Sequence, residues 1–297
     1  MGKPFLFYLL LSLAPVTFAA ELGVYTTRQF RSGSCTLQIR ELMSSSAKPT
    51  FVFVNGIPVT SIIYDRLARK VYSELGASVQ LVDLPGTGKS RNSSYTWSAS
   101  EACLGAYLQS LAKDVVLVVH DIAGPIALPL LADSRLRFEG VVILNTILKP
   151  SVFRPVFPLS LIRLPLVGAV VSPLIPPFYF EKEIRSKGLH RNAIIEKREI
   201  RRLYRDFAEG FGKSRLHKVM RGFELTPERD ARIYRGLQSP VPKLTLWGLS
   251  DPSLGGQSQF IPHIKNTEIL KFPEAKHFLM LDYADEIFRS IQSSGII

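Results

Sequence analysis

Short apolar runs alternate with segments of helical periodicity along most of the chain. The apolar runs, rich in Val, Leu, Ile and Phe, predict strands at 34–40, 50–54, 79–84, 114–119, 140–144, 243–247 and 268–272. Amphipathic spacing predicts helices at 62–75, 99–112, 122–132 and 281–291. Because nearly continuous apolar strands are typical of parallel sheets covered on both faces, this pattern predicts an α/β fold with a mostly parallel sheet flanked by helices.

The alternation stops near Lys149 and resumes with the strand predicted at 243–247. Seven prolines fall within the largely apolar stretch 150–177, and a basic segment with helical spacing follows it. We therefore expect residues 148–238 to form an inserted helical cap, and residues 20–147 with 239–297 to form the core domain. The cap should lie over the carboxyl ends of the strands, where open α/β sheets bind ligands.

The first 19 residues have the layout of a secretory signal peptide. A short positive start, an apolar run and the small residues of Thr17-Phe18-Ala19 predict cleavage after Ala19 and an exported protein of 297 − 19 = 278 residues. A single membrane anchor is the alternative, but the run is short for a span of roughly 20 residues and carries Pro15 near its end. An oxidising compartment would permit a disulfide between Cys35 and Cys103; two buried thiols are the other possibility.

The formal charge of +12 is concentrated in one region. Residues 182–221 hold 13 Lys and Arg against five Asp and Glu. The helical spacing of apolar residues between the cations favours a solvated helix face, and weak association with an anionic membrane surface is the alternative. Because no nucleic-acid-binding motif accompanies the charge, we expect no nucleic-acid partner.

The strongest chemical signal is the sequence Val118-Val119-His120-Asp121-Ile122-Ala123-Gly124. A buried strand here enters a helix through one tight turn with small residues after it, which is the pattern of a nucleophile elbow. The elbow position is Asp121 instead of the more usual serine. By itself this pattern is weak evidence, because Asp is also a frequent helix N-cap.

Two later segments strengthen the catalytic interpretation. Asp251 follows the strand that ends at Trp247, and His277 follows the next strand. Nucleophile, acid and histidine occur in this order in a catalytic triad built on a parallel sheet, so we expect Asp121, Asp251 and His277 to converge at one sheet edge.

Together these motifs resemble the α/β-hydrolase superfamily, in the branch of epoxide hydrolases and haloalkane dehalogenases. The matching segments span roughly residues 50–280: Asn55-Gly56-Ile57-Pro58, residues 83–90 (DLPGTGKS), the His120-Asp121 elbow, the turn 247–251 and the His277 loop. The resemblance implies an oxyanion hole formed by the backbone N–H groups of Ile57 and Ile122. The chain departs from the branch at Asn55, where histidine is usual.

A carboxylate nucleophile predicts displacement at a saturated carbon and an alkyl-enzyme ester, which water activated by His277 would then hydrolyse. This disfavours serine-type esterase or lipase chemistry. The resemblance implies that cap tyrosines donate a proton to the opened epoxide, and Tyr179 and Tyr234 lie in segments similar to those of epoxide hydrolase caps. Both could equally be ordinary core or rim aromatic residues.

Haloalkane dehalogenases commonly place a Trp after the nucleophile and often an Asn in the oxyanion loop. The corresponding residues are Ile122 and Ile57, which have no side-chain donor. Epoxide hydrolysis of a small apolar substrate, with water as the second reactant, is therefore the leading hypothesis, and dehalogenation is the alternative. A noncatalytic protein that binds a ligand or a membrane surface is a third. We expect no metal or organic cofactor, because the Cys and His residues lack ligand spacing.

Overall fold

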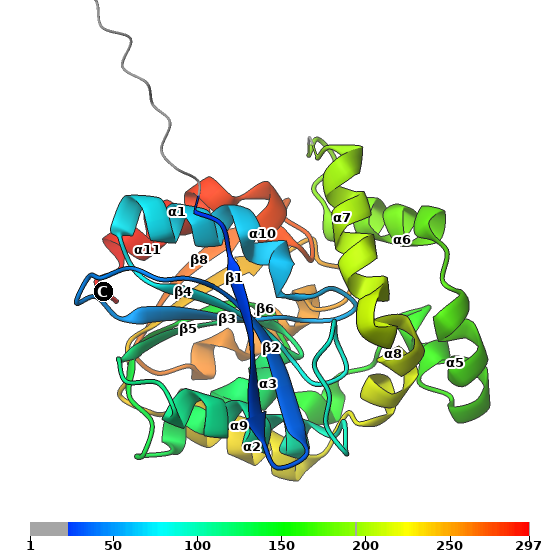
Figure 1. Cartoon of the computed structure of the whole chain (residues 1–297), viewed down its shortest axis with the longest axis horizontal. Helices are drawn as coiled ribbons and strands as arrows, with labels where there is room; N and C mark the ends of the chain where they lie inside the picture. The colour runs from blue at the N-terminus through cyan, green and yellow to red at the C-terminus, as the bar shows by residue number, and fades with distance from the viewer. Residues whose placement is uncertain (1–22, 194, 297) are drawn as a thin grey trace, which may run out of the picture.

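The computed structural model describes residues 23–193 and 195–296, so the predicted signal peptide at 1–19 lies outside the described residues. The described strands form a sheet in the order β1-β2-β4-β3-β5-β6-β7-β8 (Figure 1). These strands are β1 (Thr26–Ser32), β2 (Cys35–Leu42), β3 (Thr50–Val54), β4 (Val79–Asp83), β5 (Val115–Asp121), β6 (Phe138–Thr146), β7 (Lys243–Gly248) and β8 (Thr267–Phe272). The pairs β1–β2 and β2–β4 are antiparallel and all the others are parallel.

Helices cover both faces of this sheet. Figure 1 shows α1, α10 and α11 on one face and α2, α3 and α9 on the other. The core helices are η1 (Ser61–Tyr64), α1 (Asp65–Leu75), α2 (Trp97–Gln109), α3 (Ala123–Ala127), η2 (Leu128–Ala132), η7 (Gly255–His263), α10 (Leu279–Asp282) and α11 (Ala284–Ser293). Because β3, β4, β5 and β7 are buried along their whole length between these layers, the predicted α/β fold class is confirmed.

Two elements differ from the sequence prediction. The helix expected at 122–132 changes to 3₁₀ geometry at residue 128, because Pro129 lacks the N–H that an α-helix needs. Strand β1 was not predicted at all. It is an edge strand whose residues are mostly exposed, so it carries little apolar pattern, and its Phe30 packs on Tyr107 with the ring centroids 5.3 Å apart.

Most of the predicted insertion forms a separate group of helices beside the carboxyl ends of the strands (Figure 1). It comprises η3 (Pro150–Val152), α4 (Leu159–Ile162), α5 (Pro165–Val171), η4 (Ser172–Leu174), α6 (Pro177–Glu183), η5 (Ile184–Gly188), α7 (Lys197–Ala208), η6 (Glu209–Phe211) and α8 (Gly212–Arg221). We call this group, residues 150–221, the cap. The last helix of the segment 148–238, α9 (Pro227–Leu237), packs with the core instead, and its buried Arg229 pairs with Glu101 of α2 at 2.6 Å.

Among the described residues, none of the helices combines the length and the apolar character that crossing a bilayer would require.

Candidate active site

Asp121 lies at the tip of a strained turn between β5 and α3. Its φ is +53°, a left-handed conformation that is uncommon for a residue with a side chain. Two glycines make room for the turn: a Cβ on Gly56 would lie 2.5 Å from the Cβ of Asp121, and one on Gly124 would collide with the Thr146 hydroxyl. That hydroxyl donates a 2.5 Å hydrogen bond to the backbone oxygen of Asp121. The bend is therefore built by close packing, as the elbow motif predicts.

The Asp121 carboxylate faces backbone donors. The N–H of Ile57 donates to its Oδ2 at 2.8 Å, and the N–H of Ile122 also stabilises the ionised form. Burial raises the pKa of Asp121, and the charge of His277 together with these N–H groups offsets only part of the rise. The Ile57 N–H therefore contacts one oxygen of this buried carboxylate, and the Ile122 N–H favours its charged form.

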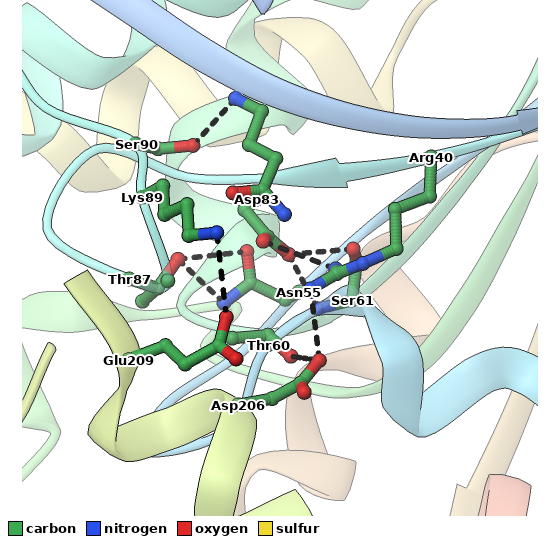
Figure 2. Close-up of polar contacts among 12 residues, drawn as sticks. Arg40, Asn55, Thr60, Ser61, Asp83, Thr87, Lys89, Ser90, Asp206 and Glu209 are labelled. Atoms are coloured by element: carbon green, nitrogen blue, oxygen red, sulfur yellow. Dashed lines mark hydrogen bonds and ion pairs between the residues drawn. The ribbon is translucent and has the colours of Figure 1, made fainter. Parts of the chain in front are cut away.

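Asn55 fixes the loop that carries the Ile57 N–H. Its Nδ2 donates to the backbone oxygens of Gly56 and Val59, each at 2.8 Å, and its Oδ1 accepts from the N–H of Leu84 at 2.7 Å. Figure 2 shows this amide between the loop and Thr87. The carboxamide thus ties the loop to the turn after β4, which is a structural task that a residue with both donor and acceptor atoms can perform.

His277 pairs with Asp251 at 2.9 Å, from Nδ1 to Oδ2. The same Oδ2 accepts from Asn145 at 2.8 Å, and Oδ1 accepts from the N–H groups of Ser253 and Leu254. Burial disfavours the charge of Asp251, but His277 and these donors hold its pKa at about 2. Burial alone would lower the pKa of His277, yet Asp251, and to a lesser degree Asp121, raise it above the ordinary value. The structure therefore brings Asp121, Asp251 and His277 together.

Two residues of the site were missed by the sequence analysis. Asn145, near the end of β6, also bonds both backbone groups of Gly248, which fixes the start of the Asp251 turn. His120 is fully buried, and its Nε2 lies 2.8 Å from the backbone oxygen of His277. Because burial holds the pKa of His120 well below its usual value, the imidazole stays neutral and supports the His277 loop. The sequence signals that could have identified them were the position of His120 directly before Asp121 and the position of Asn145 near the end of a predicted strand.

A small, mostly apolar cavity of about 90 Å³ lies between the cap and the sheet edge. Ile57 and His277, which flank Asp121, form part of its wall. The cap supplies the remaining apolar wall through Val156, Phe157, Pro158, Leu159, Ile162, Ile175, Phe180, Ile184, Phe207 and Leu216. A site of this composition suits a small apolar molecule.

The sequence of residues 51–290 matches the family model described as alpha/beta hydrolase family. The chain belongs to the alpha/beta hydrolase family. Its structure is similar to haloalkane dehalogenase DatA from Agrobacterium tumefaciens C58, with a TM-score of 0.74, 19% identity, and 93% of this chain and 99% of that chain covered. Haloalkane dehalogenase DbeA from Bradyrhizobium elkani USDA94 gives a TM-score of 0.72, 21% identity, and 92% and 98% coverage.

Epoxide hydrolase CorEH is also similar, with a TM-score of 0.70, 15% identity, and 91% of this chain and 98% of that chain covered. No curated protein matches the sequence. At these identities the solved structures establish the fold, and the family match establishes that this chain is a hydrolase of the alpha/beta type. The resemblance seen in the sequence motifs is confirmed.

The structure of this hydrolase places the two cap tyrosines differently. Tyr179 of α6 is half-buried and lines the cavity, and partial burial and Glu183 raise its pKa. Tyr234 of α9 is 53% exposed and lies in a separate surface groove with Lys149 and Phe260. The structure therefore brings Tyr179 to the site and leaves Tyr234 outside it.

A buried ionic network joins the cap to the core close to the oxyanion loop (Figure 2). Arg40 of β2 pairs with Asp83 at 3.2 Å and with Asp206 of α7 at 2.8 Å. Asp83 also accepts from the N–H and the hydroxyl of Ser61. Since Thr60, within the same turn, approaches Asp206 at 3.4 Å, the cap helix is anchored within a few residues of Ile57.

A disulfide links Cys35 of β2 to Cys103 of α2, with the two Cα atoms 5.9 Å apart. The sequence left open whether these two cysteines form a disulfide or remain buried thiols, and the structure contains the disulfide. Among residues 23–193 and 195–296, no group of three or more His, Cys, Asp or Glu side chains is arranged to hold a metal ion.

Proposed function

We propose that this hydrolase opens epoxides through a covalent ester on Asp121. The observation that carries the proposal is a carboxylate at the tip of the elbow, with one oxygen accepting the Ile57 N–H and an imidazole nearby that is paired to a second carboxylate. A carboxylate suits attack on a saturated carbon, whereas a serine hydroxyl suits attack on a carbonyl.

In the first step Asp121 Oδ1 attacks an epoxide carbon, the carbon–oxygen bond of the ring breaks, and the Tyr179 hydroxyl gives its proton to the departing oxygen. The product is an alkyl ester whose carbonyl oxygen is Oδ2, already beside the Ile57 N–H. The raised pKa of Tyr179 keeps its hydroxyl protonated and able to donate at neutral pH.

In the second step His277 takes a proton from water, and the hydroxide attacks the ester carbonyl. The negative charge that develops on Oδ2 is stabilised by the N–H groups of Ile57 and Ile122. The tetrahedral intermediate releases the alkoxide, which takes the proton held by His277. The remaining proton of the attacking water restores the Tyr179 hydroxyl, so one epoxide and one water give one diol.

Dehalogenation is the second candidate, because its first step is the same displacement and its leaving group needs no proton. Besides partial burial, the nearby Glu183 carboxylate raises the pKa of Tyr179, and a weaker acid favours a reaction that does not use the tyrosine as a proton donor. Against it, the buried side chains of Ile57 and Ile122 offer a departing halide no hydrogen-bond donor.

Replacement of His277 by Gln tests the ester intermediate. The variant should still be alkylated but should hydrolyse the ester slowly, so intact-mass spectrometry after exposure to a panel of epoxides and haloalkanes should show an adduct that peptide mapping places on Asp121. The double variant with Asp121→Asn is the control and should show none. Absence of any adduct across the panel would refute both candidate reactions.

Variants of Tyr179 and Tyr234 distinguish epoxide hydrolysis from dehalogenation. Tyr179→Phe should abolish diol formation, since the alkoxide then lacks its proton donor, while Tyr234→Phe should leave it unchanged because that residue lies outside the cavity. Halide release that survives in Tyr179→Phe, with no diol formed by the wild-type protein, would replace epoxide hydrolysis with dehalogenation.

We also propose that the protein is exported after cleavage behind Ala19. The Cys35–Cys103 bridge supports this, because disulfides persist in oxidising compartments. N-terminal mass mapping of the protein expressed with its leader should find a mature chain that begins at Ala20. An uncleaved N-terminus in the cytosolic fraction would contradict export.

A further inference from the structure

The exposed apolar side chains of this protein are concentrated on the cap. Of the thirteen large hydrophobic residues that are exposed in the described part of the chain, eight lie between residues 152 and 178. We define the outer patch as the seven that belong to α5 and its flanking segments, with exposures from 39% to 84%. They are Phe157, Leu164, Leu166, Val167, Val170, Leu174 and Phe178. Figure 1 shows α5 and α6 at the end of the cap farthest from the sheet.

Helix α5 is apolar on its solvent side as well as on its packed side. Its sequence is PLVGAVV, and only Gly168 is buried, against the backbone of Ile162 and the side chain of His217 in α8. Residues 150–180 contain no Asp or Glu, and their only charged residues are Arg154 and Arg163. A contiguous apolar surface of this kind on a water-soluble fold is typical of an interaction site.

Cations lie on the segments that carry the outer patch and on the helix that packs against it. Arg163 follows α4, Lys182 lies on α6, and Lys218 and Arg221 lie on α8, the helix that packs on α5. Within the described residues, none of these four cations forms an ion pair with a carboxylate. Residues 150–221 hold 15 Lys and Arg against six Asp and Glu, a net +9 in a chain of +12.

We propose that the outer patch docks this hydrolase on the surface of an anionic phospholipid bilayer. The apolar side chains of α5 would enter the boundary between headgroups and acyl chains, and the surrounding cations would bind phosphate groups, as in an interfacial amphipathic helix. A second copy of the chain is the less suitable occupant, because two caps of charge +9 would repel each other.

The cavity wall adjoins the outer patch. Phe157 belongs to both surfaces, since it is 66% exposed and also lines the cavity. Ile175 and Tyr179 line the cavity and directly follow Leu174 and Phe178 of the patch. Docking would therefore place the cavity entrance at the lipid, and, if the proposed function holds, the substrate would be a lipid-soluble epoxide that arrives from the bilayer.

Vesicle cosedimentation of the purified protein tests the docking. Binding should be strong to phosphatidylcholine vesicles that contain phosphatidylglycerol and should weaken at high salt. The variant Leu166→Glu/Val170→Glu should lower the partition coefficient about tenfold or more, because two apolar side chains that would enter the bilayer become charged. Met43→Glu changes an exposed apolar residue outside the cap and should bind like the wild-type protein.

The cations are tested in the same assay. Lys182→Glu and Lys218→Glu should each lower binding to anionic vesicles about fivefold or more, since each Lys near the surface contributes about 1 kcal/mol. Lys271→Glu, at an exposed position on β8, is the matched control. Asp121→Asn should bind vesicles normally, which separates this proposal from the proposed reaction.

Two outcomes would overturn the proposal. One is equal vesicle binding by Leu166→Glu/Val170→Glu and the wild-type protein. The other is a dimer in sedimentation-velocity experiments that the same double variant dissociates, since the patch would then be covered by a second copy. Circular dichroism melting of the patch, lysine and Met43 variants should match the wild-type protein, because the side chains altered in them are exposed.

Discussion

The sheet edge and the cap hold their side chains in different ways. At the sheet edge, backbone groups fix the reactive atoms: the Ile57 N–H holds Asp121, and the Ser253 and Leu254 N–H groups hold Asp251. In the cap, apolar side chains form the cavity wall while others face solvent, and it joins the core beside Ile57 through Arg40 and Asp206. We therefore expect the sheet edge to determine the class of chemistry and the cap to determine which molecules reach it.

The largest effect is expected at the sheet edge. Asp121→Asn removes the nucleophile without changing the size of the side chain, so turnover should fall by roughly four orders of magnitude or more. Steady-state kinetics on the substrate found in the adduct screen would measure this. The variant should melt at the same or a higher temperature, because the buried charge is gone. Asp133→Asn, at a surface loop, is the control. Appreciable turnover by Asp121→Asn would contradict the proposal that Asp121 is the nucleophile.

The next effect concerns the ionic network that joins the cap to the core, and it compares how much each ion pair contributes to the free energy of unfolding. Arg40→Met leaves Asp83 buried without its cation, and removal of one partner of a buried pair costs about 3–5 kcal/mol of unfolding free energy. Asp206→Asn removes the cap partner only and leaves the Arg40–Asp83 pair intact. It should cost about 1 kcal/mol, the value of one hydrogen bond.

Urea unfolding of both variants provides the measurement. Equal losses in the two variants would mean that the cap pair and the core pair form one unit, and would remove the distinction between the two regions at this junction.

A third effect concerns Asn145, whose side-chain amide donates a hydrogen bond to Asp251. Asn145→Ala removes a hydrogen bond to a charged carboxylate worth about 1.5–3 kcal/mol, so kcat should fall about 10- to 100-fold. The apparent pKa of the acid limb should also fall, because a less fixed Asp251 stabilises the protonated His277 less. Asn92→Ala, in a surface turn, is the control. A loss of stability with an unchanged pH profile would make Asn145 a purely structural residue.

The sequence predicted the parts of the site that depend on chain order and on backbone geometry. Asp121, Asp251 and His277 each stand at or just after the end of a predicted parallel strand, so their convergence at one sheet edge could be inferred before any distance was known. The resemblance to the family named Ile57 and Ile122 as the expected oxyanion donors. The core strands were also predicted, because burial on both faces leaves a continuous apolar run.

The remaining features depend on packing that a linear pattern does not encode. Nothing in the sequence places Asn145 against Asp251 or His120 under the His277 loop, because these contacts join elements more than 100 residues apart. Tyr179 and Tyr234 occur in similar sequence contexts, yet α9 packs under the sheet and carries Tyr234 away. An apolar stretch rich in proline likewise gives no indication of which side chains face solvent, so the outer patch required the structure.

The smallest expected effect is a difference between the pH profiles of the two kinetic parameters, and it links the two steps of the proposed reaction. The first step needs the carboxylate of Asp121, whose pKa is raised by burial, and the second needs neutral His277, whose pKa is raised by Asp251. Both requirements fail as pH falls. When ester formation is reversible, both enter kcat/KM, which should then decrease at least tenfold per pH unit below an apparent pKa above about 6.5, the ordinary value for histidine. Asp251, with a pKa of about 2, stays ionised throughout.

The ester intermediate should make the pH profile of kcat differ from that of kcat/KM. Once Asp121 is alkylated, its charge no longer raises the pKa of His277, so the acid limb of kcat should lie at lower pH than that of kcat/KM when ester hydrolysis limits turnover. Initial rates from pH 4 to pH 9 on a soluble epoxide would measure both limbs. Because the pKa of Tyr179 is raised, neither parameter should fall on the alkaline side of this range. Activity that is highest at the acid end would contradict a histidine base and would leave the Asp121 ester without its means of hydrolysis.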